Sequence, residues 1–466
     1  MKRVLSIIFA LFLVVSLFSF GSLTASAAIE GDYEYKITDG KATITQYTGS
    51  ATDLTIPSTL GGYPVTTLGK YAFNYLSSLR SVVIPDSVTS IGDQAFATCT
   101  SLTSVSIPDS VTSIGDHAFF QCHSLTFITI GKGVTSIGKS AFNDCRSLIS
   151  VNIPDSVTSI GDFAFNGCKS LTSATIGKGV TSIGHGVFRF CYSLASVTIS
   201  DGVPTIGNSM FQECTALTSV TIPDSVTAIN RAAFYMCSSL TSVTIPDSVT
   251  SVGISAFLGC ASLTSVTIGN SVASINDHAF SNCSSLKSIT IGNRVTSIGK
   301  SAFLGCASLT SVTIPDSVTT IDKYAFTDCF ALTSVTIGKS VTSISEYAFN
   351  KCKSLTSVTI GKSVTSMGCG VFNDCTALTD VYYPGSEEDR ANIEIENQNS
   401  ALSEATWHYN YKPASDPTTT QTTTEPETET SSNQTDVLPL VLVIAGIVMV
   451  GIVAAWIVIA KKKKQA

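Results

Sequence analysis

Between Ser78 and Thr376 the chain consists of thirteen consecutive copies of a 23-residue unit, with no insertion or deletion between them. The copy at 239–261 is SLTSVTIPDSVTSVGISAFLGCA. A strict period of about 20 to 50 residues marks a solenoid, in which each unit can bury its apolar side only against its neighbours. The spacing therefore predicts one continuous core that grows coil by coil, rather than a series of separate globular domains.

Apolar residues recur in each copy at positions 2, 5, 7, 11, 14, 18, 19 and 22, counted from its first residue. In the copy that begins at Ser239, Val243 and Ile245 alternate with Ser242 and Thr244. This alternation predicts a strand with one buried face and one exposed, hydroxyl-bearing face. Pro-Asp or Gly-Lys at positions 8 and 9 predicts a turn, and a second short extended segment follows. The rest of the unit closes the coil either as a helical turn or as an irregular arc, so we expect a β-rich repeat solenoid.

The N-terminal residues are typical of an exported protein. Residues 1–27 combine Met1-Lys2-Arg3, an apolar run and a small-residue site that ends at Ala27, the pattern of a secretory signal peptide. Residues 28–52 alternate around Asp39-Gly40 and predict a β-hairpin that caps the array. One degenerate unit precedes the thirteen regular copies, so the predicted solenoid spans 53–376.

The C-terminal residues predict a cap, a stalk and an anchor. The repeat register is lost within 377–411, which we interpret as a C-terminal cap. Residues 412–436 are rich in Thr, Glu, Pro and Ser, as is typical of a disordered stalk. The apolar run 437–460 is long enough to cross a membrane as one helix, and the lysines of the tail 461–466 favour a cytoplasmic end. We predict a single-pass type I protein of the cell membrane with extracellular repeats; a sortase-type anchor is the alternative.

The repeat pattern L-x-x-V-x-I-P-x-x-V-x-x-I-G-x-x-A-F-x-x-C-x resembles the BspA-like, Treponema-type class of leucine-rich repeat, from Asp53 to Thr376. The stretch from Ala377 to Tyr411 is similar to the segment that closes such arrays in bacterial members. The resemblance implies a bacterial surface protein with a binding or adhesion role, whose partners are host or matrix proteins or other microbes. It brings no catalytic motif, so it gives no residue a catalytic role.

Thirteen of the fourteen cysteines occupy position 22, from Cys99 to Cys375, and Cys369 lies outside this series. Neighbouring coils would bring their Cα atoms within reach of a disulfide. However, side chains stacked in register point in parallel, and an odd number of thiols cannot pair completely. Metal-ligand spacing such as C-x-x-C is absent. We therefore interpret the series as buried thiols that act as small hydrophobic residues, and we expect no metal and no cofactor.

Charge and motifs argue against two further classes of protein. The net charge is −7, which argues against a nucleic-acid-binding surface. The sequence contains no P-loop, no H-E-x-x-H and no G-x-S-x-G motif. The five histidines have no repeated Cys or carboxylate partner at catalytic spacing. We expect neither nucleic-acid binding nor enzymatic activity.

Binding specificity is expected where the copies differ. The outward strand positions 4 and 6 are nearly uniform Ser and Thr, whereas positions 16, 17, 20, 21 and 23 vary. Large side chains occur at the variable positions between the second and seventh copies, namely Phe120, Phe163, Arg189, Phe190, Tyr192, Tyr235 and Met236. Aromatic and Arg side chains are enriched among binding hot spots, so these seven are the candidate partner-binding residues. The alternative is that the variable positions tolerate drift and some of the rings tuck under neighbouring coils.

Two classes of function remain open. The first is a surface adhesin or interaction module that contacts an extracellular protein or glycan. The second is a structural surface-layer or spacer protein without a dedicated ligand, which the near-identical copies favour. A weaker third hypothesis makes the Ser/Thr face a surface for glycans or ordered water.

Overall fold

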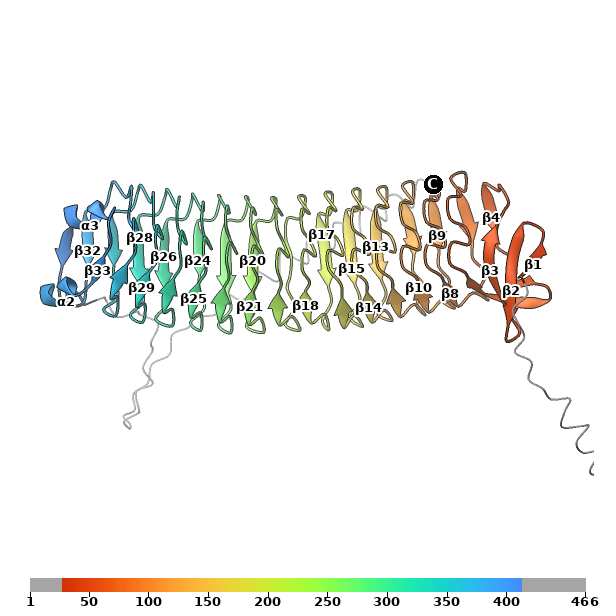
Figure 1. Ribbon diagram of the computed structural model, residues 1–466, viewed down its shortest axis with the longest axis horizontal. Helices are drawn as coiled ribbons and strands as arrows, with labels where there is room; N and C mark the ends of the chain where they lie inside the picture. The colour runs from red at the N-terminus through yellow and green to blue at the C-terminus, as the bar shows by residue number, and fades with distance from the viewer. Residues whose placement is uncertain (1–26, 413–466) are drawn as a thin grey trace, which may run out of the picture. The chain divides into compact units, whose positions relative to one another are not determined.

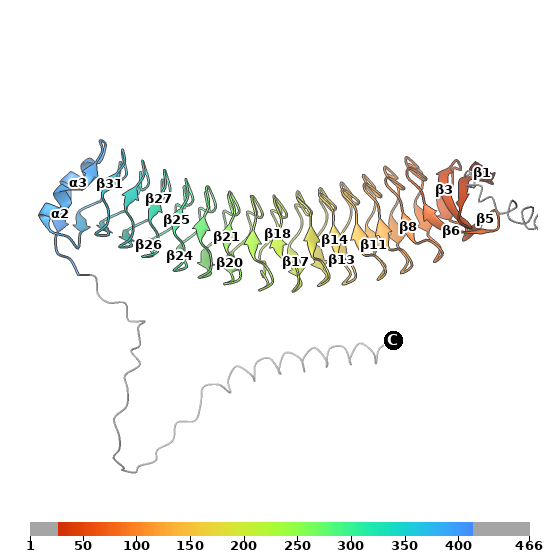
Figure 2. The same cartoon turned by 60° about the horizontal axis from the view of Figure 1, so that its bottom comes forward.

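The computed structural model describes residues 27–412, and there the chain winds into a β-solenoid with coils stacked side by side (Figures 1 and 2). Equivalent strands pair in parallel with an offset of 23 residues, as Ser242 pairs with Ser265. Strand Ser242–Ile245 alternates exposed and buried residues, which places Val243 and Ile245 in the core. The predicted repeat solenoid is therefore confirmed, together with the inward direction of positions 5 and 7.

One side of the solenoid is formed by the strands of positions 4 to 7, the long-strand face. These strands are β4 (Asp53–Thr55), β7 (Ser81–Val83), β9 (Ser104–Ser106), β11 (Phe127–Thr129), β13 (Ser150–Ile153), β15 (Ser173–Ile176), β17 (Ser196–Ile199), β20 (Ser242–Ile245), β22 (Ser265–Ile268), β24 (Ser288–Thr290), β26 (Ser311–Ile314), β28 (Ser334–Ile337), β30 (Ser357–Thr359), β32 (Asp380–Tyr382) and β34 (Thr406–His408).

A second side is formed by two-residue strands at positions 13 and 14, extended by β6 at the N-terminal end. This stack comprises β6 (Tyr63–Leu68), β8 (Ser90–Ile91), β10 (Ser113–Ile114), β12 (Ser136–Ile137), β14 (Ser159–Ile160), β16 (Ser182–Ile183), β18 (Thr205–Ile206), β19 (Ala228–Ile229), β21 (Ser251–Val252), β23 (Ser274–Ile275), β25 (Ser297–Ile298), β27 (Thr320–Ile321), β29 (Ser343–Ile344), β31 (Ser366–Met367) and β33 (Glu394–Ile395).

The third side consists of turns, not of a helix. Positions 17 and 21 have positive φ in all thirteen regular copies, for example Ser255 at 57° and Gly259 at 75°. The N–H groups of positions 17, 19 and 21 donate to carbonyls of the next coil, as Phe257 donates to Ala279 over 2.8 Å. The coil is thus closed by an irregular arc, which decides between the two closures that the sequence left open.

The core contains a continuous stack of phenylalanine rings and, beside it, the series of thiols. Ring centroids of successive coils lie from 4.9 Å apart, at Phe73 and Phe96, to 5.8 Å apart, at Phe188 and Phe211. All position-22 cysteines are free and buried. Each thiol donates a hydrogen bond to the position-19 carbonyl of the preceding coil, as Cys260 does to Phe234 over 3.2 Å. These thiols are therefore hydrogen-bond donors as well as small hydrophobic residues.

Polar side chains tie each coil to its neighbour on the outside. Threonines at positions 3 and 12 donate to carbonyls 23 residues earlier, as Thr241 donates to Thr218 over 3.1 Å. Aspartates at positions 9 and 16 accept from the N–H of the same position in the next coil, as Asp109 accepts from Lys132 over 2.7 Å. The aspartates thus cap the following coil in addition to favouring a turn in their own.

The short-strand stack is interrupted once within residues 27–412, between β16 and β18. In the other regular copies, position 12 donates its N–H to the preceding coil, as Thr181 donates to Thr158 over 3.0 Å. Position 12 of the sixth copy is Pro204, which has no N–H. The carbonyl of Thr181 therefore loses its partner in the next coil, and the strand pairing stops there.

The two ends of the array differ from the regular coils. At the N-terminal end β1 (Ala27–Glu30), β2 (Tyr33–Thr38) and β3 (Lys41–Tyr47) pair antiparallel, β3 pairs with β6, and β5 (Thr59–Leu60) also pairs with β6. At the C-terminal end two short helices, α2 (Glu387–Ala391) and α3 (Ser400–Glu404), interrupt the strands. Both ends join the same hydrophobic core.

The predicted stalk and anchor and nearly all of the signal peptide lie outside the described residues. The anchor is the predicted membrane span at 437–460. Within 27–412, no helix is long and apolar enough to cross a membrane.

Candidate functional site

The variable positions 20, 21 and 23 lie at the end of the arc, just before the chain enters the long-strand face of the next coil. We call positions 20 to 23 of the second to seventh copies the corner strip; it comprises residues 120–123, 143–146, 166–169, 189–192, 212–215 and 235–238. Its backbone follows the common arc, with Phe190 at a φ of 60° and its N–H bonded to the Gln212 carbonyl over 2.9 Å. Bulky side chains disfavour this conformation, so the hydrogen bonds between coils must stabilise it.

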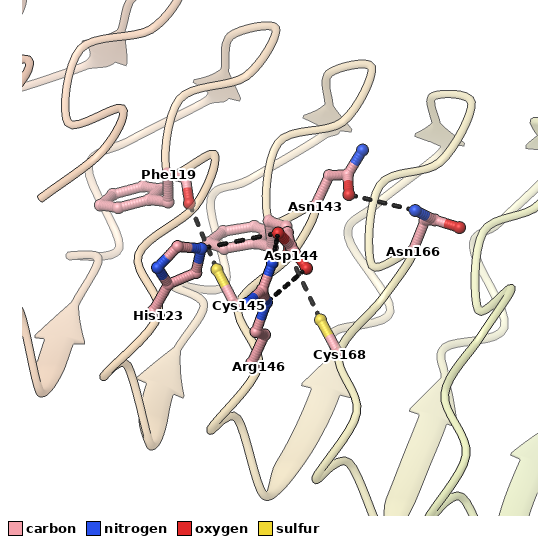
Figure 3. A network of polar contacts seen from close by, with 9 residues as sticks. Phe119, His123, Asn143, Asp144, Cys145, Arg146, Asn166 and Cys168 are labelled. Atoms are coloured by element: carbon pink, nitrogen blue, oxygen red, sulfur yellow. Dashed lines mark hydrogen bonds and ion pairs between the residues drawn. The ribbon is translucent and has the colours of Figure 1, made fainter. Parts of the chain in front are cut away.

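Charged side chains form a network in the second and third copies (Figure 3). Arg146 donates to both oxygens of Asp144, over 2.9 and 2.7 Å. His123 Nε2 lies 3.5 Å from Asp144 Oδ2, without the geometry of a hydrogen bond. The hydrogen bonds from Arg146 hold the pKa of the Asp144 carboxyl below its usual range, and His123 lowers it further. Arg146 thus binds the Asp144 carboxylate in a bidentate ion pair.

This network lacks a nucleophile, although Cys145 lies next to Asp144 in the sequence. The Cys145 thiol points into the core and donates to the Phe119 carbonyl over 3.2 Å (Figure 3). Burial raises the pKa of this thiol well above its ordinary value, so it stays protonated near neutral pH. Among residues 27–412, no group of three or more His, Cys, Asp or Glu side chains could hold a metal ion.

A cationic and aromatic cluster occupies the fourth and fifth copies. The Arg189 guanidinium lies 4.3 Å from the Phe190 ring centroid, and the Phe190 and Tyr192 rings lie 6.1 Å apart. Lys169 Nζ lies 5.9 Å from the Tyr192 ring. Tyr192 is 37% exposed, whereas Arg189 and Phe190 are half-buried. The structure therefore brings together three of the seven sequence-predicted residues.

The other four predicted residues are placed differently. Phe120 is half-buried and makes an edge contact with His117, with centroids 5.5 Å apart. Phe163 is half-buried, and a Cβ on Gly186 in the next coil would meet its ring at 2.6 Å. Tyr235 is half-buried, while Met236 is 40% exposed. Phe163 thus lies outside the corner strip, in a space that a glycine leaves open.

Glycines at positions 17 and 21 share this arrangement. A Cβ on any of them would contact the equivalent side chain of the preceding coil, which is Asp144, Phe163, Met236, Asn282 or Tyr347. The glycines concerned are Gly167, Gly186, Gly259, Gly305 and Gly370. Side chains at positions 17 and 21 therefore lean toward the following coil, and a glycine at the same position of that coil makes room for them.

Sequence comparison of the copies missed two exposed side chains beside the corner strip. Phe127 at position 4 is 60% exposed, and Ile149 at position 3 is 41% exposed. Most copies carry Ser at position 4 and Thr at position 3. The signal that could have found them is an apolar residue at a position that carries Thr or Ser in most copies.

Buried polar atoms without a hydrogen-bond partner concentrate in the same corner. Within the described range six such side-chain atoms occur, and three belong to the corner strip: His123 Nε2, Asn166 Oδ1 and Arg189 Nε. The other three are serine hydroxyls at position 10, on another part of the coil. Of the three atoms in the corner strip, His123 Nε2 lies within ion-pair distance of Asp144 Oδ2, at 3.5 Å.

The comparisons with known proteins agree with this architecture. A family model described as a BspA type leucine rich repeat region, with six copies, matches residues 66–195, 158–287 and 274–391. A leucine-rich repeat protein from Bacteroides ovatus is similar at 29% identity and a TM-score of 0.70, over 82% of this chain and 99% of its own.

Two other solved structures are similar in sequence. A leucine rich cell surface protein from Faecalibacterium prausnitzii is 33% identical, over 80% of this chain and 99% of its own, with a TM-score of 0.43. A leucine rich repeat protein from Treponema pallidum is 27% identical, over 51% of this chain and 91% of its own, with a TM-score of 0.33. No curated protein matches the chain.

Proposed function

The chain belongs to the BspA-type leucine-rich repeat proteins, and from this premise we propose that it is a cell-surface binding or adhesion protein. Its solenoid would contact an extracellular protein or glycan on a host, in the matrix or on another microbe. We further propose a bacterial, single-pass membrane location with the repeats outside. The cell-surface description of the Faecalibacterium relative supports the location.

The observation that carries the proposal is the contrast between the corner strip and the rest of the coil. Interior positions are nearly invariant among the copies, and outward strand positions are nearly uniform Ser and Thr. The corner strip instead carries large aromatic and basic side chains, among them Arg189, Phe190 and Tyr192. A recognition surface needs such local differences, because a uniform repeat presents the same chemistry on every coil.

Binding of the full-length chain, kept in detergent, to immobilised matrix proteins and to neighbouring microbes tests this function. The joint variant Phe190→Ser, Tyr192→Ser and Tyr235→Ser should lose binding while its circular dichroism spectrum is unchanged. Phe330→Ser is the matched control, since Phe330 is 42% exposed at position 23 of a distant coil. Binding that survives in the triple variant would contradict a role for these rings.

A spacer protein without a dedicated ligand is the second candidate, favoured by the uniform hydroxyl face. Apart from Ser81, which donates to Asp53, the Ser and Thr hydroxyls at positions 4 and 6 of the regular copies have no protein partner within the described range. A chain that binds no partner in the panel, no glycan on an array and shows no thermal hysteresis would favour the spacer. We propose no enzymatic activity, because the solenoid family has no shared catalytic motif.

A further inference from the structure

A second set of exposed side chains continues the corner strip onto the long-strand face. Arg146 lies three residues before Ile149, and the Ile149 N–H donates to the carbonyl of Thr126, the residue before Phe127, over 3.2 Å. Lys169 and Tyr192 occupy the Arg146 position in the next two coils. We define the docking patch as Phe127, Arg146, Ile149, Lys169, Arg189 and Tyr192. These residues belong to three consecutive copies: Phe127 and Arg146 to the third, Ile149 and Lys169 to the fourth, and Arg189 and Tyr192 to the fifth.

The patch carries an excess of positive charge on an acidic chain. Lys169 and Arg189 form no ion pair within 27–412, and each instead lies near an aromatic ring. Arg189 Nε is buried and has no hydrogen-bond partner. The corner strip holds two carboxylates: Asp144 is already held by Arg146, and Glu213 stands one coil beyond Arg189, at the position equivalent to Phe190. Two cations therefore remain available for an incoming anion, in a chain of net charge −7.

We propose that the docking patch binds an acidic amphipathic segment of a protein partner; this rests on the binding function proposed above. Carboxylates of the partner would meet Lys169 and Arg189, and its apolar side chains would cover Phe127 and Ile149. Guanidinium groups suit carboxylates because their paired N–H donors match the two oxygens, as Arg146 shows with Asp144. Charges across such an interface also raise the association rate and exclude basic partners.

An acidic peptide fits this surface better than a sulfated glycan does. Phe127 and Ile149 have no polar atoms in their side chains, so they cannot satisfy the hydroxyl groups of a sugar. One face of Phe190 is covered by the Arg189 guanidinium, which restricts stacking of a sugar ring there. Aliphatic side chains of a peptide would instead bury both exposed apolar residues, and each buried side chain contributes to binding through the hydrophobic effect.

The experiment measures fluorescence anisotropy of a short labelled peptide that alternates Glu and Leu, with the full-length chain in detergent. Its Lys-for-Glu analogue and a labelled heparin fragment are the competing probes. We expect the Glu-Leu peptide to bind, and binding to weaken as salt is raised. Lys169→Ser with Arg189→Ser, and separately Phe127→Ser with Ile149→Ser, should each weaken it by about tenfold or more.

A matched control lies at the other end of the solenoid. Lys353 Nζ lies 6.0 Å from the exposed Phe330 ring, an arrangement like that of Lys169 and Tyr192. Phe330→Ser with Lys353→Ser should leave binding of the Glu-Leu peptide unchanged. The proposal would be overturned if the Lys analogue bound as well as the Glu-Leu peptide, if heparin bound and the peptide did not, or if no probe bound. It would also be overturned if the control variant lost as much peptide binding as the patch variants, or if either patch variant bound the peptide fully.

The same variants separate this proposal from the broader function. If the full-length chain binds matrix proteins and the patch variants bind them equally well, the docking patch is wrong and the adhesion function stands. If the chain binds no matrix protein or microbe but binds the Glu-Leu peptide through the patch, the adhesion function fails and the patch stands.

Discussion

The corner of the solenoid has the same backbone in the fifth and eighth copies but very different side chains. In the fifth copy the corner carries Arg189, Phe190 and Tyr192, whereas in the eighth copy the same positions carry Leu258, Gly259 and Ala261. Position 21 has positive φ in both, 60° at Phe190 and 75° at Gly259. The hydrogen bonds between coils therefore set the arc whatever side chain stands there, and the corner is free to vary while the interior is not.

The largest expected effect is on the pH dependence of stability, and it arises from the buried thiols that all thirteen regular copies share. Burial raises the pKa of the Cys260 and Cys306 thiols to about 12, above the ordinary value of 9.0. The unfolded chain loses these protons at a lower pH than the folded chain does. The free energy of unfolding contributed by the neutral, buried thiols is therefore fully present below about pH 9. It is then lost as pH rises toward 12, by up to about 1.4 kcal/mol per thiol for each pH unit.

Denaturant midpoints measured from pH 8 to pH 11 would test this alkaline loss. The joint variant Cys237→Ala, Cys260→Ala and Cys283→Ala should reduce the slope of stability against pH. Val249→Ala is the control, because it removes buried volume without removing an ionisable group, and its slope should match that of the unmodified chain. A midpoint independent of pH across this window would contradict the buried-thiol interpretation.

A single interior ring should matter far more than a corner ring. Phe257 is fully buried and stacks between Phe234 and Phe280, with centroids 5.1 Å from each. Phe257→Ala should cost about 3 to 5 kcal/mol of unfolding free energy, because it opens a cavity in the stack. Phe190→Ala, at the half-buried corner, should cost well under half as much. Equal losses in urea unfolding would show that the corner is as constrained as the interior.

The glycines at positions 17 and 21 allow a sharper test by double-mutant cycle. Gly186→Ala places a Cβ against the Phe163 ring and should destabilise the chain by about 1 to 3 kcal/mol. Phe163→Ala with Gly186→Ala should recover part of this loss, and the backbone cost of positive φ should remain. Additive effects of the two substitutions would mean that the ring and the glycine do not interact.

The smallest effect is expected in the sixth copy, where the short-strand stack is interrupted beside Pro204. Pro204→Thr restores an N–H and a hydroxyl that can donate to the Thr181 carbonyl, as Thr227 donates both groups to the Pro204 carbonyl. We expect a gain of about 0.5 to 1.5 kcal/mol and stronger hydrogen-exchange protection of β18. Ala273→Pro, which removes the equivalent N–H from a regular coil, should do the opposite. Unchanged protection in Pro204→Thr would show that proline does not cause the interruption.

The sequence predicted the interior of this protein well and its corner only in part. Strict spacing of apolar residues identified the buried positions, and each is buried in nearly every coil. Among the candidate residues, Arg189, Phe190 and Tyr192 lie together, but Phe163 leans over Gly186. The direction of the Phe163 side chain depends on Gly186, which lies 23 residues later. A comparison of the copies at a single position does not take this neighbour into account. Phe127 was missed because its face was judged by its majority residues.

By itself, the sequence determined the solenoid, because a 23-residue period with eight apolar positions can bury those residues only by stacking identical coils. Tertiary structure alone decided how each coil closes, which neighbour each polar group bonds and which corner side chains reach solvent. The physical reason is that these features arise between coils: a carbonyl, a thiol or an aspartate finds its partner 22 to 26 residues away, and only the stacking register brings the two together.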